Sequence, residues 1–154
     1  MLAGGAMGVG GLLYLAVLIN PLTSVIGAVT LVSYIAVYTP LKRVTSLNTL
    51  IGAVPGALPP LMGWTAARIN ATGIAPEAWS LVAILFFWQL PHFLAIAWMY
   101  REDYEGAGFR MISEGKQGRE HTGRFSVISC LALLLAALSP FFLHISGVMY
   151  LGGA

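Results

Sequence analysis

Charged residues are scarce in this sequence. They make up 9% of its 154 residues, while hydrophobic residues make up 58%, against about 25% charged residues in a typical soluble domain. No charged residue occurs between Met1 and Leu41, a stretch about twice as long as the roughly 20 apolar residues that span a bilayer. This distribution excludes a water-soluble globular domain, and the sequence predicts an integral protein of the lipid bilayer.

Cysteine and aspartate each occur once, as Cys130 and Asp103. A single cysteine cannot form a disulfide within the chain. No basic segment precedes the first apolar stretch, which argues against a secretory signal peptide. The net charge of +2 says little about partners, because the placement of charge matters more than its sum in a membrane protein. We expect no nucleic-acid partner.

Five apolar segments are long enough to be transmembrane helices, so we expect an all-α, polytopic helix bundle that forms a single membrane domain over residues 1–154. The expected spans are residues 1–19, 22–38, 48–67, 78–100 and 125–143. The third contains Pro55, Pro59 and Pro60 and is expected to be broken, facing protein or a cavity there. A sixth span begins near Ile145, ten residues before the end of the sequence, so we interpret the chain as part of a larger membrane protein.

Basic residues predict the orientation of these spans. Seven of the eight lie in the loops at 39–47 and 101–124, and only Arg68 lies elsewhere. With five spans, these two loops must lie on the same side of the membrane. The positive-inside rule then makes both loops cytoplasmic.

The fourth expected span carries polar side chains that an ordinary membrane helix does not need. On an uninterrupted helix, Gln89, His92 and Asp103 would share one face, and Pro91 would favour a kink beside His92. Gln89 or His92 alone is equally well explained as a hydrogen-bonding contact between helices. Together with a carboxylate at the cytoplasmic end, they predict the wall of a polar cavity.

A candidate diphosphate site lies at the predicted cytoplasmic face. Asp103 could hold a hard cation such as Mg²⁺, which prefers oxygen ligands. The segment 38–48, YTPLKRVTSLN, offers Lys42 and Arg43 together with Tyr38 and Asn48. A basic pair beside a span is by default only a topology signal. Cations and hydrogen-bond donors beside a carboxylate and metal are, however, what binding a diphosphate requires.

Two stretches closely resemble a known family. YTPLKRVTSLNTLIGAVPGALPPLMGW and FFWQLPHFLAIAWMYREDYEGAGFRM are similar to the UbiA-type intramembrane prenyltransferases, and the WQLPHF and DYEGAG elements resemble the haem branch of that family. The similarity covers essentially the whole chain. It implies a bundle of nine transmembrane helices, of which this chain would supply the third to the seventh and the start of the eighth.

The resemblance implies a reaction and its site. The farnesyl group of farnesyl diphosphate would be joined to a vinyl group of haem B, giving haem O and diphosphate, with Mg²⁺ assisting. Asp103 matches the second of two acidic motifs and would be the catalytic and metal-binding residue, with the diphosphate at Tyr38, Lys42, Arg43 and Asn48 and the haem at Gln89 and His92. The first acidic motif would precede Met1, so the chain alone is expected to be inactive.

The resemblance also implies a location and partners. We expect the bacterial inner membrane, with farnesyl diphosphate, haem B and the lipid bilayer as partners. Haem A synthase or the assembly of a terminal oxidase is a further partner that the resemblance suggests.

Two other functions stay open. A UbiA-type prenyltransferase acting on a quinone precursor is disfavoured by WQLPHF, and an assay of haem B against 4-hydroxybenzoate separates the two. Broken helices with buried polar residues also occur in membrane transporters, although the five spans contain no evident inverted repeat. A purely structural subunit ranks last, because it would not need acidic and basic residues gathered on one side.

Overall fold

The computed structural model describes residues 2–68, 73–108, 112, 117–147 and 150, and all its regular elements in these residues are helices. In chain order they are α1 (Leu2–Tyr14), η1 (Leu15–Ile19), α2 (Pro21–Val32), η2 (Ser33–Tyr38), α3 (Thr39–Leu41), α4 (Asn48–Ala57), α5 (Pro59–Ala66), α6 (Pro76–Met99), α7 (Arg101–Gly106) and α8 (Gly118–Phe142). The two η segments are π-helical.

Among the residues that the structure describes, five helical segments are long and apolar enough to cross a membrane, which confirms the predicted spans and the all-α class. They are Leu2–Ile19, Pro21–Leu41, Asn48–Ala67, Pro76–Met99 and Gly118–Phe142. The last begins before the expected residue 125, because its first turns are polar and exposed and carry an ion pair of 3.2 Å between Glu120 and Arg124. Most of the expected sixth span lies outside the described residues.

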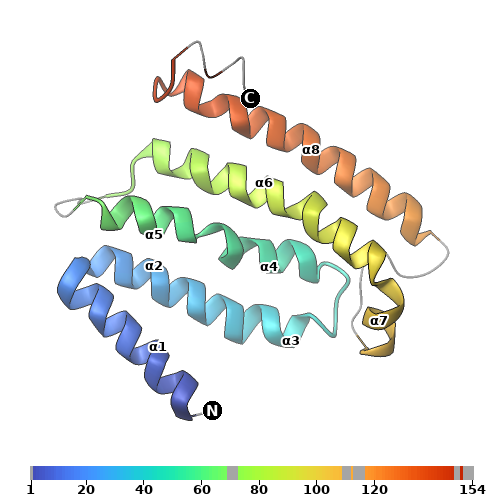
Figure 1. Cartoon of the computed structure of the whole chain (residues 1–154), viewed down its shortest axis with the longest axis horizontal. Coiled ribbons are helices and arrows are strands. Elements are labelled where there is room, and N and C mark those ends of the chain that lie inside the picture. The colour runs from blue at the N-terminus through green and yellow to red at the C-terminus, as the bar shows by residue number, and fades with distance from the viewer. Residues whose placement is uncertain (1, 69–72, 109–111, 113–116, 148–149, 151–154) are drawn as a thin grey trace.

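The spans lie side by side in chain order, and consecutive spans run in opposite directions (Figure 1). The packing contacts agree: α2 packs on α1 and α5, and α6 packs on α4, α5 and α8. The connection after α3 and the helix α7 therefore lie at one end of the bundle, and the turn at Asn20, the end of α5 and the start of α6 lie at the other. The described parts of the loops at 39–47 and 101–124 that adjoin α3 and α6 are thus at the same end of the bundle, while their cytoplasmic orientation stays a prediction.

The third span is broken, as its prolines predict. α4 ends at Ala57 and α5 starts at Pro59, so that Leu58 alone connects them. Pro59 occupies the first turn of α5, where its missing N–H costs nothing. The Leu58 carbonyl accepts from the backbone N–H of Leu61 and of Met62 at 2.9 and 3.1 Å. Both halves pack against α6, so the interruption faces protein rather than lipid.

The end of the bundle opposite α7 is held by buried polar contacts, which we call the Asn20–Thr23–Thr65 cluster. Asn20 caps α2 by accepting from the Thr23 N–H at 2.8 Å and from the Thr23 hydroxyl at 2.9 Å. Its Nδ2 donates to the Thr65 carbonyl at 2.8 Å, and the hydroxyls of Thr23 and Thr65 are also 2.8 Å apart. The cluster joins α2 to α5 and leaves none of these hydroxyls unsatisfied.

Candidate active site

A cavity of about 330 Å³ lies at the end of the bundle that carries α7, within the size range of small-molecule sites. We call it the polar cavity. It is lined by Tyr34, Tyr38, Lys42, Asn48, Thr49, Gly52, Gly56, Gln89, Phe93 and Tyr104. These residues come from η2, α4, α6, α7 and the turn that follows α3. The cavity therefore brings together four of the predicted site residues, namely Tyr38, Lys42, Asn48 and Gln89.

The π-helical segment η2 supplies the two tyrosines of the polar cavity. The backbone N–H and the hydroxyl of Thr39 both donate to the Tyr34 carbonyl, the hydroxyl at 2.9 Å. The rings of Tyr34 and Tyr38 lie next to each other, with centroids 5.1 Å apart and planes tilted by 39°. Single π-helical turns inside α-helices frequently occur at functional sites, because they redirect the side chains that follow.

Two glycines on α4 make room for larger side chains from neighbouring helices. A Cβ atom at Gly52 would lie 2.7 Å from Cε2 of Tyr38, and one at Gly56 would lie 2.5 Å from Oε1 of Gln89. Both distances are well below van der Waals contact, so any side chain here would displace Tyr38 or Gln89. Gly52 and Gly56 also line the polar cavity, so this face of α4 is turned toward it.

Gln89 is held between α4 and α6. Its side chain is 5% exposed, and its Nε2 donates to the backbone carbonyl of Ala53 at 2.6 Å. Its Oε1 is the atom nearest to Gly56, which also lines the cavity. Gln89 thus joins two helices and lines the cavity between them.

Asp103 lies on α7, and the prediction that it shares a helix face with Gln89 is wrong. α6 ends at Met99, Tyr100 leaves the helical conformation with φ −107° and ψ 26°, and α7 starts at Arg101. Arg101 stabilises this turn by donating to the Trp98 carbonyl at 3.2 Å and by lying 4.9 Å from the centre of the Trp98 ring. Helical spacing therefore cannot be carried across Tyr100.

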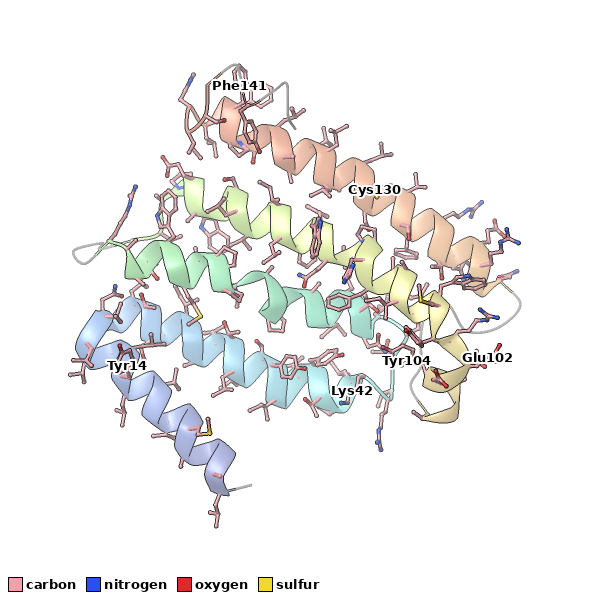
Figure 2. The ribbon with its side chains drawn as sticks, in the orientation of Figure 1. Tyr14, Lys42, Glu102, Tyr104, Cys130 and Phe141 are labelled. Atoms are coloured by element: carbon pink, nitrogen blue, oxygen red, sulfur yellow. The ribbon has the colours of Figure 1, made fainter. Side chains whose placement is uncertain are left out.

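The residue that α7 directs into the polar cavity is Tyr104, while Asp103 is exposed and does not line it. Figure 2 shows Lys42 and Tyr104 at the same end of the bundle, with Glu102 farther out on α7. Lys42, after α3, and Tyr104, on α7, both line this cavity, and a joint site of Lys42 or Arg43 with Asp103 stays a prediction.

His92 and Arg43 also lie outside the lining of the polar cavity. His92 is exposed, and its ring stacks on Trp88 with centroids 5.1 Å apart and planes 17° apart. Arg43 is exposed in the turn after α3. The roles predicted for His92, Arg43 and Asp103 stay predictions.

Four side chains that line the cavity were missed from the sequence: Tyr34, Thr49, Phe93 and Tyr104. Spacing could have revealed two of them, because Tyr34 precedes Tyr38 by four residues and Phe93 follows Gln89 by four. Tyr104 was not predictable in this way, since its direction depends on the turn at Tyr100.

Within the described ranges of the chain, no three His, Cys, Asp or Glu side chains come together to hold a metal ion. Mg²⁺ is, however, usually bound by one or two carboxylates and by the phosphate oxygens of a substrate. Asp103 therefore fits an ion that is shared with a bound diphosphate, and not a preformed protein metal centre.

The chain matches the UbiA prenyltransferase family over residues 1–154. It is 46% identical over 151 residues to a protein named protoheme IX farnesyltransferase from Solibacter usitatus, covering 98% of this chain and 51% of the relative. Relatives of the same name from Koribacter versatilis and Myxococcus xanthus are 46% and 47% identical over 94% and 88% of this chain, and 46% and 45% of their own length. The chain thus spans about half the length of these relatives. No solved structure matches it.

Proposed function

Because this chain belongs to the UbiA prenyltransferase family, we propose that the protein transfers the farnesyl group of farnesyl diphosphate to a vinyl group of haem B, with haem O and diphosphate as products. The name shared by the similar proteins supports haem as the acceptor. The WQLPHF segment, residues 88–93, is the part of this sequence that favours haem over a quinone precursor.

The observation that carries the proposal is the combination of groups in the polar cavity. Lys42, Tyr38, Tyr104 and Asn48 all line it, and the Asn48 amide donates to the Lys42 carbonyl at 3.3 Å, which holds the two residues together. A lysine ammonium with several neutral donors suits a diphosphate, whose oxygens accept charge-assisted hydrogen bonds. The same groups stabilise the negative charge that grows on a departing diphosphate.

The rest of the cavity suits the other half of the reaction. When the bond between C1 of the farnesyl group and the diphosphate oxygen breaks, the electron pair leaves with the diphosphate and an allylic cation remains. Tyr34, Tyr38 and Phe93 present aromatic rings to the cavity, and such rings attract cations through their π faces. The cation then adds to the vinyl group of haem B, and water supplies the hydroxyl group and releases a proton.

Asp103, next to the cavity residue Tyr104, is the residue that we propose to hold Mg²⁺. The ion, when bound with the diphosphate, would neutralise part of its charge and so make it a better leaving group. Arg43 is proposed to add positive charge at the same end of the bundle.

The haem would be contacted by residues on more than one side of α6. Gln89 faces the cavity, whereas His92 is exposed and stacked on Trp88. A planar aromatic pair is a surface on which a macrocycle can stack, and an imidazole can ligate iron. We therefore propose that His92 contacts haem at the cavity's edge and that Gln89 acts inside it.

The proposed location is the bacterial inner membrane, with the loops at 39–47 and 101–124 in the cytoplasm. The basic residues of these loops support this orientation. A partner in haem A synthesis or in the assembly of a terminal oxidase would be the natural recipient of the product.

The reaction is tested with membranes from cells that express the full-length protein, because this chain alone is expected to be inactive. They are supplied with farnesyl diphosphate and Mg²⁺, and with either haem B or 4-hydroxybenzoate as acceptor. We expect a farnesylated haem and no prenylated benzoate, with mass spectrometry as the readout. Prenylated benzoate would instead favour the quinone branch of the family, and movement of a substrate without covalent change would favour a transporter.

Asp103→Asn tests the metal role in the same assay. It removes a charge but almost no volume, so we expect turnover to fall at least about 100-fold while the protein still accumulates in the membrane. Glu102→Gln, on the same exposed helix, is the matched control and should stay within about twofold. Equal turnover of Asp103→Asn and the unchanged protein at limiting Mg²⁺ would remove Asp103 from the mechanism.

A further inference from the structure

A second cavity, of about 320 Å³, lies between α2 and the broken third span. We call it the apolar groove. Gly27 and Leu31 line it from α2, and Pro55 and Met62 line it from α4 and α5. Tyr34 and Gly56 line both the groove and the polar cavity. The two spaces are therefore neighbours that meet at Tyr34 and Gly56.

The two spaces differ in chemistry. The polar cavity contains Lys42 and the tyrosine hydroxyls, whereas the groove is lined mainly by aliphatic side chains and glycine. Thr30 also lines the groove, but its hydroxyl already donates to the Ile26 carbonyl at 2.8 Å. A ligand that occupies both spaces must have an anionic end and a hydrocarbon end.

We propose that the apolar groove binds the distal isoprene units of the prenyl diphosphate, and that Met62 limits the length of the chain that it accepts. This inference rests on the proposed prenyl transfer, since it takes the diphosphate to lie in the polar cavity near Lys42. It assigns donor-length specificity to α2 and α5, away from the groups that hold the diphosphate.

The dimensions of the span support this assignment. Tyr38 and Gly27 are eleven residues apart on one membrane span, or about 16 Å at the rise of a helix. This distance is comparable to an extended farnesyl chain. Gly27 lies at the far end of the groove, where a Cβ atom would be 3.2 Å from Cε of Met62 and 3.3 Å from Cδ1 of Leu15.

Met62 is suited to limit the length of the prenyl chain in the groove, and substitution of Met62 should change that length. Its terminal methyl group is near Gly27, and both residues line the groove, so the size of this side chain sets the space available at that point. Methionine is unbranched and flexible, and its replacement by a smaller or larger side chain changes the length of the groove without touching Lys42 or Tyr104.

The test compares prenyl donors of different length. Membranes with the full-length protein, either unchanged or carrying Met62→Ala or Met62→Trp, are assayed with geranyl, farnesyl and geranylgeranyl diphosphate and haem B. We expect Met62→Ala to raise the kcat/KM ratio of geranylgeranyl to farnesyl diphosphate about tenfold, and Met62→Trp to raise the ratio of geranyl to farnesyl diphosphate by a similar factor. Met7→Ala, at an exposed position of α1, is the matched control and should leave both ratios unchanged.

Each outcome decides the inference. If the unchanged protein uses farnesyl diphosphate but the Met62 variants lose activity equally with all three donors, Met62 is only a packing residue. If the donor ratios stay unchanged, the groove holds something else, such as a lipid acyl chain or another protein segment. If Met62→Trp does not accumulate in the membrane, the comparison of Met62→Ala with the unchanged protein still tests the inference. Failure of the unchanged protein with every donor would overturn the proposed function and, with it, this inference.

Discussion

Lys42 and Arg43 are adjacent in the sequence, but only Lys42 lines the polar cavity. We expect Lys42→Ala to weaken farnesyl diphosphate binding about 10- to 100-fold, because a charged hydrogen bond contributes about 1.5–3 kcal/mol. Arg43→Ala changes the same net charge at an exposed position and should weaken binding less than about threefold. The dissociation constant of farnesyl diphosphate, measured for both variants, checks this difference. Equal losses would mean that only the summed charge of the pair matters.

His92 is the residue whose role is tested by two substitutions. We expect His92→Ala to lower haem binding or turnover and to leave farnesyl diphosphate affinity unchanged, because His92 does not line the polar cavity. Its exposed position predicts a stability change within about 0.5 kcal/mol. His92→Gln keeps a hydrogen-bonding group but ligates iron poorly. Full activity of this variant would exclude ligation, and a loss of thermal stability alone in His92→Ala would assign a structural role.

At the scale of elements, the contact between α4 and α6 depends on Gly56. A Cβ atom here would lie 2.5 Å from Oε1 of Gln89, so we expect Gly56→Ala to displace Gln89 and break its bond to Ala53. Thermal stability and turnover should both fall. The combination with Gln89→Ala should relieve the clash, so the double variant should lose less stability than the sum of the two single changes.

Gly63→Ala on α5 is the control for the Gly56 experiment. A Cβ atom at Gly63 would meet nothing within 4 Å. This change should therefore be neutral or stabilise the helix by up to about 1 kcal/mol. If the stability losses of Gly56→Ala and Gln89→Ala are additive, the close approach of Gly56 to Gln89 is not the cause of the stability loss in Gly56→Ala.

The sequence predicted the elements better than the site, for physical reasons. Long apolar runs identify membrane spans, and Pro59 identifies the break in the third span, because both effects are local. The turn at Tyr100 has no glycine or proline to mark it; it depends on Arg101 contacting Trp98. Because the sequence does not reveal this turn, the helix was predicted to continue through Tyr100. Asp103 was therefore assigned to the cavity wall, and Tyr104 was missed.

For the whole molecule, the testable property is orientation in the membrane. In a Cys130→Ser background, cysteines are introduced singly at Ser46, Glu102 and Gly73, all of them exposed. If the positive-inside assignment holds, a membrane-impermeant maleimide should label Gly73→Cys in intact cells, and label Ser46→Cys and Glu102→Cys only after the membrane is opened. Labelling of Ser46→Cys and Glu102→Cys on opposite sides would contradict the fold itself.

Because of the Asn20–Thr23–Thr65 cluster, we expect the two ends of the bundle to differ in how far they move when α2 tilts. Two hydrogen bonds join α2 to α5 there, one from Asn20 to the Thr65 carbonyl and one between the hydroxyls of Thr23 and Thr65, so we expect the two helices to tilt relative to each other about this point. Tyr38 is fifteen residues from Thr23, a lever of about 22 Å, so a tilt of about 5° would move it by about 2 Å. Gly27, about 6 Å from the pivot, would move by only about 0.5 Å. A tilt about this cluster would therefore displace Tyr38, in the proposed diphosphate site, more than Gly27, in the groove that we propose for the hydrocarbon chain.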